Sequence, residues 1–365
     1  MQADPFVGVL LHAIGGLAAA SFYLPYRRVR GWSWETYWLA GGFFSWIVAP
    51  WVLALLIVPG TPAILHAAPI QDLFWTWFFG VLWGVGGLMF GLTMRYLGIS
   101  LGYAVALGFC AAFGTLIPPL YDGELREIVR TAPGRFVLLG VGTCLAGIAL
   151  SGLAGSRRER ELSEEQKRAA VREFRFARGM VVAVVCGILS ASMSYAFRAG
   201  KPIGELAVRQ GAPPLWRNLP VLVVILAGGF ATNFVWCALL NLKNRSGGQY
   251  LGQGADGTAA PVAQNYLWCA AAGVTWYLQF FFYGMGTTKM GPFDFSSWTL
   301  HMASIIIFST LWGIALQEWK GTSGRTRRLM ALGLLVLIAS TLVVGYGNYL
   351  KVGGDGGTGV APRRG

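Results

Sequence analysis

Ten apolar runs, each long enough to cross a bilayer, follow one another along the chain with short gaps between them. A helix needs about 20 apolar residues to cross the hydrocarbon core, and only helices or closed barrels satisfy the backbone there. The runs are too long and too evenly apolar for barrel strands. The sequence therefore predicts an all-α integral membrane protein with ten transmembrane helices, at residues 5–25, 36–58, 72–94, 98–119, 134–154, 179–198, 217–240, 262–287, 294–316 and 328–350.

Charged residues are scarce and lie mostly in the gaps between these runs. The net charge is +13, but only 12% of the residues are charged, against about one-quarter in soluble chains. Because the Lys and Arg residues form no basic face, we expect no nucleic-acid partner. The five cysteines lie within apolar runs without CxxC spacing, so we expect neither a metal site nor a disulfide framework. We expect no cofactor, because the chain lacks a Walker A motif and its GxGxxG match at 252–257 follows no strand.

The charged loop at 155–178 divides the chain into halves of five runs each, 1–154 and 179–350. Counted over alternate loops, 18 of the 29 Lys and Arg residues fall on the side of this loop. The positive-inside rule then predicts that the loop is cytoplasmic and that both termini lie outside. Its mixed charges favour a solvated or surface-lying helix, with a regulatory or lipid-binding role as the alternative. Residues 351–365 are predicted to form a disordered tail.

Short strings of the first half recur in the second half in the same order. Residues 16–27 parallel 187–198, residues 83–91 parallel 276–284, and residues 113–116 parallel 308–311. Because five runs are an odd number, the second half must insert upside down relative to the first. Two inverted five-helix repeats are the usual plan of secondary transporters, which hold their substrate between the halves near the midplane.

Polar side chains interrupt the eighth run at 276–286. Trp276, Gln279 and Tyr283 are spaced i, i+3 and i+7, so a helix puts them on one face. A sugar needs aromatic faces for its C–H side and amides or hydroxyls for its OH groups, so we predict that these residues bind a sugar-like solute. Further candidates for this site are Trp83 in the matching run, Asn233 in the seventh and Trp298 in the ninth. The alternative for both amides is that they join helices by hydrogen bonds.

Coupling transport to an ion requires a titratable or cation-binding group within the membrane, where such groups are rare and costly. The candidates are Asp294, His301, His12 and Glu35. Asp294 and His301 are seven residues apart, so they share a helix face along which a proton could pass. Each candidate also has a structural alternative: an N-cap for Asp294, a helix-dipole position for Glu35 and packing for the two histidines.

Several long strings carry a resemblance to a known family: Phe22-Tyr with Trp32-Ser-Trp-Glu-Thr, Gly91-Leu-Thr-Met-Arg-Tyr-Leu-Gly, Trp276-Tyr-Leu-Gln-Phe-Phe-Phe-Tyr, Ser297-Trp-Thr-Leu-His-Met and Glu318-Trp. Over nearly its whole length the chain resembles the bacterial L-rhamnose–proton symporters of the drug/metabolite transporter superfamily. The resemblance implies ten helices in two inverted repeats in the inner membrane, and uptake of L-rhamnose or a related 6-deoxy sugar with protons by alternating access. It also implies roles for Asp294 and His301, which match the family's acidic residue and its Leu-His-Met string.

The chain departs from the family's pattern in the third run, where Gly86-Gly-Leu-Met stands in place of asparagines. Because a site that bonds a hydroxyl rejects sugars lacking it, this change bears on which sugar is recognised. The alternatives left open are a carrier or exporter of another small solute, and sodium as the coupled ion. We expect no enzyme, because three histidines and scattered cysteines supply neither a nucleophile–base pair nor a metal cluster. The expected partners are a sugar, the proton and the bilayer, while monomer and homodimer are both left open.

Overall fold

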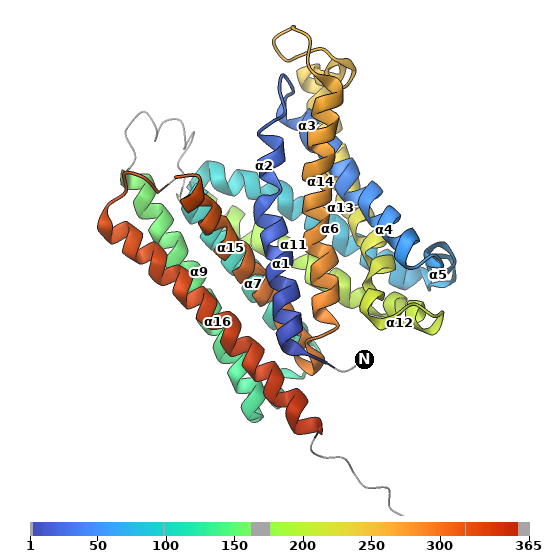
Figure 1. Cartoon of the computed structure of the whole chain (residues 1–365), viewed down its shortest axis with the longest axis vertical. Helices are drawn as coiled ribbons and strands as arrows, with labels where there is room; N and C mark the ends of the chain where they lie inside the picture. Colours follow the sequence, from blue (N-terminus) through green and yellow to red (C-terminus); the bar gives the residue numbers. More distant parts are fainter. Residues whose placement is uncertain (1–2, 98, 162–175, 318, 357–365) are drawn as a thin grey trace, which may run out of the picture.

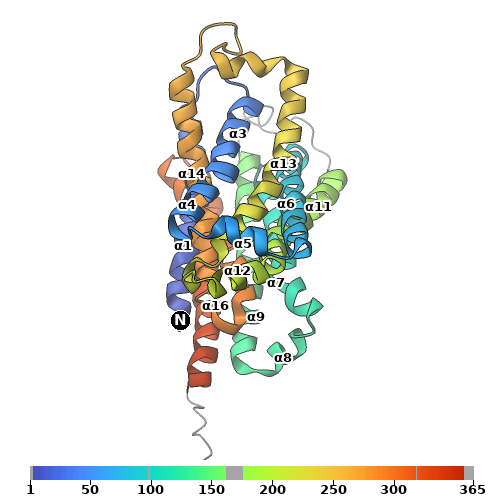
Figure 2. The ribbon, with the colours of Figure 1, turned by 90° about the vertical axis from the view of Figure 1, so that its right-hand side faces the viewer.

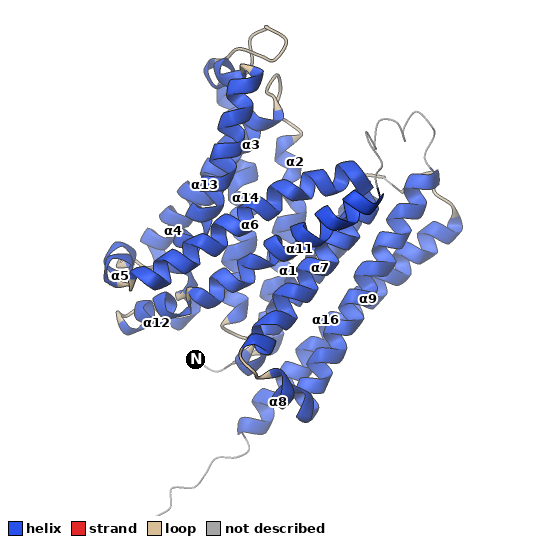
Figure 3. Cartoon of the chain, turned by 180° about the vertical axis from the view of Figure 1, so that it is seen from behind, coloured by secondary structure: helices blue, strands red, loops and turns tan. Residues whose placement is uncertain are grey.

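The computed structural model describes residues 3–97, 99–161, 176–317 and 319–356, and these residues form helices and no strand (Figure 3). The second predicted run consists of three pieces, α3 (Trp34–Phe43), the π-helical turn η1 (Phe44–Val48) and α4 (Ala49–Ile57). The other long helices are α1 (Pro5–Ser21), α6 (Ile70–Leu97), α7 (Ile99–Tyr121), α9 (Ala132–Glu161), α11 (Phe176–Ala199), α13 (Asn218–Asn244), α14 (Val262–Thr287), α15 (Ser297–Ala315) and α16 (Gly324–Gly356). Short helices lie between them: α2 (Tyr23–Tyr26), α5 (Thr61–Ala67), α8 (Leu125–Arg130), α12 (Lys201–Arg209) and the 3-10 turns η2 (Pro214–Trp216), η3 (Ser246–Leu251) and η4 (Gly291–Ser296).

Within the described residues, eight helical segments are long and apolar enough to cross a membrane. They coincide with eight of the ten predicted runs, so the prediction of an all-α membrane protein is confirmed. The predicted spans 98–119 and 262–287 contain the helices α7 and α14, which are not among the eight. α14 is less apolar because it carries Gln264, Asn265 and Gln279, of which the last two are buried.

The predicted linker and tail lie mostly outside the described residues. α9 continues to Glu161 and α11 begins at Phe176, so helices extend into the predicted linker from both sides. α16 continues to Gly356, so residues 351–356 of the predicted tail are helical. The remainder of the linker, 162–175, and of the tail, 357–365, is outside the described residues.

The helices pack in two patterns that resemble each other. α1 lies against α14 and α15, while α11 lies against α6 and α7 (Figure 1). α14 also contacts α3 and η1, and α6 also contacts α13. α9 and α16 run side by side along one edge of the bundle (Figures 1 and 3).

Glycines allow close approach in both patterns. A Cβ at Gly16 would lie 2.8 Å from the backbone carbon of Ser304 in α15. A Cβ at Gly187 would lie 3.0 Å from the backbone nitrogen of Cys110 in α7. Small residues at such contacts let backbones approach where lipid gives no hydrophobic drive for helix association.

Two connections are tied together at one end of the molecule (Figure 2). The Asn265 side chain accepts a hydrogen bond from the Arg30 backbone N–H at 3.0 Å and donates one to the Arg30 carbonyl oxygen at 2.8 Å. Gln249 Oε1 accepts hydrogen bonds from Ser33, from its backbone N–H at 2.7 Å and its hydroxyl at 3.0 Å. The connection between α2 and α3 is therefore fixed to the connection between α13 and α14.

Candidate functional site

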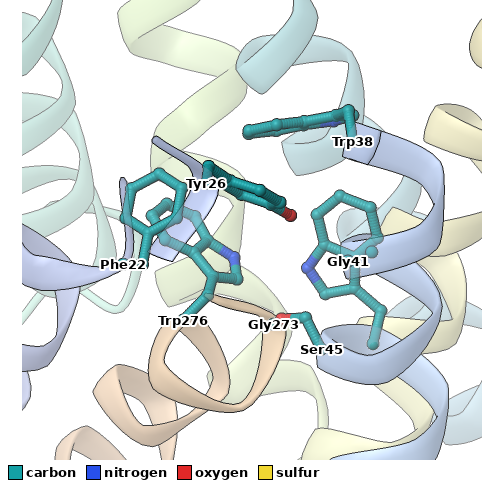
Figure 4. Close-up of a pocket in the computed structure, with 9 residues that line it drawn as sticks. Phe22, Tyr26, Trp38, Gly41, Ser45, Gly273 and Trp276 are labelled. Atoms are coloured by element: carbon teal, nitrogen blue, oxygen red, sulfur yellow. The ribbon is translucent and has the colours of Figure 1, made fainter. Parts of the chain in front are cut away.

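A narrow cavity of about 10 Å³ lies between the end of α1, the second predicted run and α14 (Figure 4). This is room for about one water molecule, so in the described conformation a larger solute enters only if the surrounding helices separate. Its floor is aromatic, with the rings of Phe22 and Trp276 at a centroid distance of 4.3 Å. The lining residues are Phe22, Tyr26, Trp38, Gly41, Gly42, Ser45, Trp46, Gly273 and Trp276.

Local backbone structure creates this space. The π-helical turn η1 carries Ser45 and Trp46, and single π turns inside helices are frequent at functional sites. A Cβ at Gly41 would collide with the Tyr26 hydroxyl, and a Cβ at Gly273 would collide with the Gly41 carbonyl oxygen. The two glycines therefore bring α3 and α14 together and leave room for the Tyr26 phenol, which points toward Gly41 (Figure 4).

Three buried polar atoms of the pocket lining have no hydrogen-bond partner within the described part of the chain: Ser45 Oγ, Trp46 Nε1 and Trp276 Nε1. Figure 4 shows the Trp276 ring nitrogen and the Ser45 hydroxyl turned toward the same space. Buried polar groups are nearly always paired, because leaving one unpaired costs about 1–3 kcal/mol. Two indole donors and one hydroxyl suit a solute that carries several hydroxyls.

A second buried cluster surrounds Tyr283, farther along α14. His12 of α1 and His301 of α15 are fully buried, and each ring centroid lies 5.3 Å from that of Tyr283. Trp298 lies 5.6 Å from Tyr283 and donates its Nε1–H to the Cys110 carbonyl oxygen at 3.0 Å. Among the residues described, neither imidazole makes a hydrogen bond through a ring nitrogen. Ionisable side chains inside membrane helices are rare and mark proton pathways, so the two imidazoles are the candidates for proton transfer.

The predicted face of α14 joins these two clusters. Trp276 packs on the C-terminal end of α1, a Cβ at Gly15 of α1 would lie 2.8 Å from the Gln279 carbonyl oxygen, and Tyr283 contacts His12. The Trp276 and Tyr283 side chains thus face α1, and the backbone at Gln279 between them approaches the same helix. Gln279 is buried, and in the described structure its Nε2 has no partner. Seven residues of helix span about 10 Å, so the pocket and the imidazoles are neighbours along one helix.

Trp83 and Asn233 contact lining residues of the pocket from the side facing away from it. The Trp83 ring lies 6.4 Å from that of Trp46 and 5.3 Å from that of Phe280. Asn233 Oδ1 accepts a hydrogen bond from Trp38 Nε1 at 3.1 Å. Neither residue lines the pocket, but each contacts one that does.

Asp294 is exposed, in the turn η4 before α15. The N-cap position of α15 is Ser296, not Asp294. The Asp294 carboxylate is close enough to Tyr283 for the two groups to interact electrostatically. The charged groups that act on it are Lys201, Arg217, Arg198 and Glu124.

Glu35 is buried in the first turn of α3, at the end where the two connections meet. Its Oε1 accepts hydrogen bonds from Asn244 Nδ2 and Ser246 Oγ, both at 2.9 Å. The carboxylate therefore joins α3 to the C-terminal end of α13 and the start of η3.

Comparison with known proteins agrees with the membrane-length helices of the structure. The family described as "L-rhamnose-proton symport protein (RhaT)" matches residues 1–349. The chain belongs to this family. The L-rhamnose-proton symporters of Cronobacter sakazakii and Shigella sonnei are 39% and 38% identical to it over 344 residues. That of Citrobacter koseri is 38% identical over 346 residues, and each match covers 93% of this chain and 97% of the relative.

Membership of the RhaT family confirms the resemblance given by the sequence strings and identifies a transporter rather than an enzyme. The departure from the family's pattern at 86–89 lies away from the pocket lining. A Cβ at Gly86 would lie 2.6 Å from the backbone nitrogen of Ser190, so this position is a close contact between α6 and α11.

Sequence reasoning found Trp276 but missed the rest of the pocket. Tyr26 and Trp38 belong to stretches treated as helix ends, where aromatic residues are expected as interfacial anchors. Ser45 and Trp46 carried a usable signal, because they form a polar pair in the middle of an otherwise apolar run. The π-helical turn that presents them has no sequence signature of its own.

Proposed function

We propose that this member of the RhaT family takes up L-rhamnose, or a closely related 6-deoxy sugar, together with protons across the bacterial inner membrane by alternating access. The observation that carries the proposal is the buried pair of imidazoles, His12 and His301, within membrane-length helices. Ionisable residues at such positions are costly and mark ion or proton pathways. The relatives named L-rhamnose-proton symporter supply the identity of the solute.

In this proposal the proton reaches the imidazoles from the end of the bundle near Asp294. Asp294 is exposed and interacts electrostatically with Tyr283, whose ring lies between His12 and His301. Asp294 therefore receives the proton, and the two imidazoles hold it inside the protein. We assign Glu35 the different task of joining two helix ends, because its carboxylate already accepts two hydrogen bonds.

The sugar lies along the face of α14 that meets α1, in contact with Trp276 and Gln279. The amide nitrogen of Gln279 has no hydrogen-bond partner among the described residues, and Gln279 lies between the pocket and the imidazoles along α14. Tyr283 and Trp298 form the boundary between sugar and proton sites, because both contact His301. Trp83 and Asn233 hold the aromatic wall from behind.

The architecture that fits this mechanism is ten transmembrane helices in two inverted repeats, 1–154 and 179–350. The packing patterns support it, since run 1 contacts runs 8 and 9 as run 6 contacts runs 3 and 4. Individual contacts support it as well. Gly15 of α1 approaches the Gln279 carbonyl oxygen, and at the positions that the sequence parallels make equivalent, Cys186 Sγ donates to the Gly86 carbonyl oxygen at 3.3 Å.

Uptake of radiolabelled L-rhamnose into proteoliposomes tests the proposal, with and without an imposed inward pH gradient. We expect accumulation only when the gradient is present. A parallel set of vesicles carries an inward sodium gradient at equal pH on both sides. Accumulation driven by sodium alone would overturn proton coupling, and no L-rhamnose uptake under any condition would overturn the substrate.

A further inference from the structure

The pocket lies where a transported solute is expected, and both halves of the chain contribute to it. Ser45 and Trp46 lie halfway along the candidate span Trp34–Ile57, and Trp276 lies halfway along α14. The sequence assigns the first two to one half and the third to the other. Transporters built from inverted repeats bind substrate near the midplane between their halves.

The π-helical turn places two neighbouring side chains on the pocket. The second run lines it with Trp38, Gly41, Gly42, Ser45 and Trp46, of which the last two belong to the π-helical turn. Ser45 and Trp46 are buried, with 2% and 4% of their surfaces exposed, yet neither polar group bonds to any described residue. A rare backbone turn that buries two unpaired polar groups costs stability without a ligand, and a solute bearing hydroxyls offsets that cost.

The remaining lining suits the apolar parts of such a solute. Phe22, Tyr26 and Trp38 present ring faces and edges to the space, and Trp38 is held in place through its hydrogen bond to Asn233. Aromatic rings pack well on the C–H face of a sugar ring and on a methyl group. A 6-deoxy sugar combines several hydroxyls with a methyl in place of one hydroxymethyl group, and the pocket offers partners for both.

We propose that this cavity, which has room for about one water in the described conformation, widens during alternating access to bind the transported sugar, and that Ser45, Trp46 and Trp276 select it, each by a hydrogen bond to a different hydroxyl. The inference rests on the proposed function, of which it names the binding site. The two indoles donate to sugar oxygens, while the Ser45 hydroxyl donates or accepts. The orientation of the sugar follows: its hydroxyl edge faces η1 and Trp276, and its methyl group faces the aromatic residues.

The test uses Ser45→Ala, Trp46→Phe and Trp276→Phe in the full chain. Ser45→Ala removes only an unpaired polar atom, so the melting temperature of the sugar-free protein in detergent stays unchanged or rises. The two Trp→Phe changes also remove ring atoms from a packed site, so these variants melt at a lower temperature, and each variant is compared with its own sugar-free form. Binding is measured as the stabilisation of each variant by L-rhamnose and by its monodeoxy analogues, alongside uptake. The matched control is Trp236→Phe, whose indole is 47% exposed on α13.

We expect each variant to bind L-rhamnose about two- to tenfold more weakly, as for the loss of one hydrogen bond. For each variant, one monodeoxy analogue should bind the variant as tightly as it binds the wild type. That analogue lacks the hydroxyl that the substituted side chain bonds in the wild type, so it loses nothing further in the variant. Trp236→Phe behaves as wild type.

The outcomes separate the pocket from the function. If the wild type transports L-rhamnose and all three variants keep its affinity, the pocket proposal is overturned and the function stands. If L-rhamnose is not transported but another sugar stabilises the wild type and not the variants, the function is overturned and the pocket stands. If no sugar binds or is transported, both are overturned.

Discussion

The contact of α1 with α14 and α15 resembles the contact of α11 with α6 and α7, but the two contacts carry different side chains. Extending the sequence parallels by a few residues matches His12 of α1 with Ala183 of α11, and His301 of α15 with Ala106 of α7. All four residues are buried, at 0–1% exposure. Similar helix packing is thus reached with methyl groups in one contact and imidazoles in the other, so packing alone does not require the histidines.

The same contrast extends to the middle of the contact. Gln279 of α14 corresponds to Gly86 of α6, and each carbonyl oxygen meets the neighbouring helix. Only the α14 side adds a polar side chain. One contact therefore serves packing, while its counterpart adds titratable and hydrogen-bonding groups, and in the proposed mechanism only this counterpart carries protons.

The largest effect, a loss of folded protein, is expected from overpacking either of the two helix contacts. Gly16→Leu and Gly187→Leu each force a side chain against backbone of the partner helix, where even a Cβ lies at 3.0 Å or less. Overpacking of this kind costs about 1–3 kcal/mol or more, so we expect little folded protein from either variant, measured by size-exclusion profile and melting temperature. Gly142→Leu on α9 is the control, since a Cβ there meets nothing within 4 Å. Tolerance of one change and not the other would break the equivalence of the two contacts.

The next largest effect is expected from a substitution that makes α14 more like α6. Gln279→Ala removes a buried amide nitrogen that is unpaired within the described residues but also leaves a small cavity, so the protein should still fold, with a modestly lower melting temperature, while L-rhamnose uptake is abolished. The control is Gln264→Ala, an exposed glutamine on the same helix. Normal uptake by the Gln279 variant would remove this residue from the site.

A selective loss of proton-driven accumulation is expected from His301→Ala, which introduces the residue type found at the equivalent position, Ala106, of the other contact. A gradient of one pH unit supplies about 1.4 kcal/mol per proton, or about tenfold accumulation for one proton per sugar. The variant should lose this accumulation and still exchange labelled for unlabelled sugar across the vesicle membrane. His66→Ala, at an exposed position on α5, serves as the control. Accumulation that persists in the His301 variant would assign proton coupling to another group.

Much of the fold could be predicted from the sequence because its signals are strong and local. Each apolar run exceeds the length of a bilayer crossing, so helix positions follow from composition alone. α14 shows the limit of this reasoning. Its polar residues lower its hydropathy because they serve contacts with α1 and the loops, and only the tertiary structure reveals those partners.

The candidate site could be predicted only in part. The spacing of Trp276, Gln279 and Tyr283 correctly predicted one shared helix face, because helix periodicity is fixed. It did not predict that the ends of this face meet different clusters, since His12 and Ser45 come from distant runs. The π-helical turn and the approach of α3 to α14 depend on packing between helices, which a single sequence does not display.

The smallest effect is expected at a third helix pair, α9 with α16, which lies outside both contacts and so provides a reference for them. Glu161 accepts hydrogen bonds from the backbone N–H of Ser323 at 2.7 Å and from the hydroxyls of Ser323 and Thr326 at 2.6 Å, at the start of α16. These donors lower the pKa of the Glu161 carboxyl below its ordinary value. A depressed folded-state pKa gives a stabilisation that is present above the unfolded-chain pKa of about 4.3 and is lost as pH falls through the folded value.

Glu161→Gln should therefore lower the melting temperature in detergent by about 2 °C or less at neutral pH, since exposed charge interactions are weak. At pH values below the folded pKa the variant and the wild type should melt together, and uptake at neutral pH should be unchanged. Glu127→Gln, at an exposed position on α8, is the control. A loss of uptake with Glu161→Gln would show that the α9–α16 pair takes part in the transport cycle, and coupling could then no longer be assigned to the α1–α14–α15 contact alone.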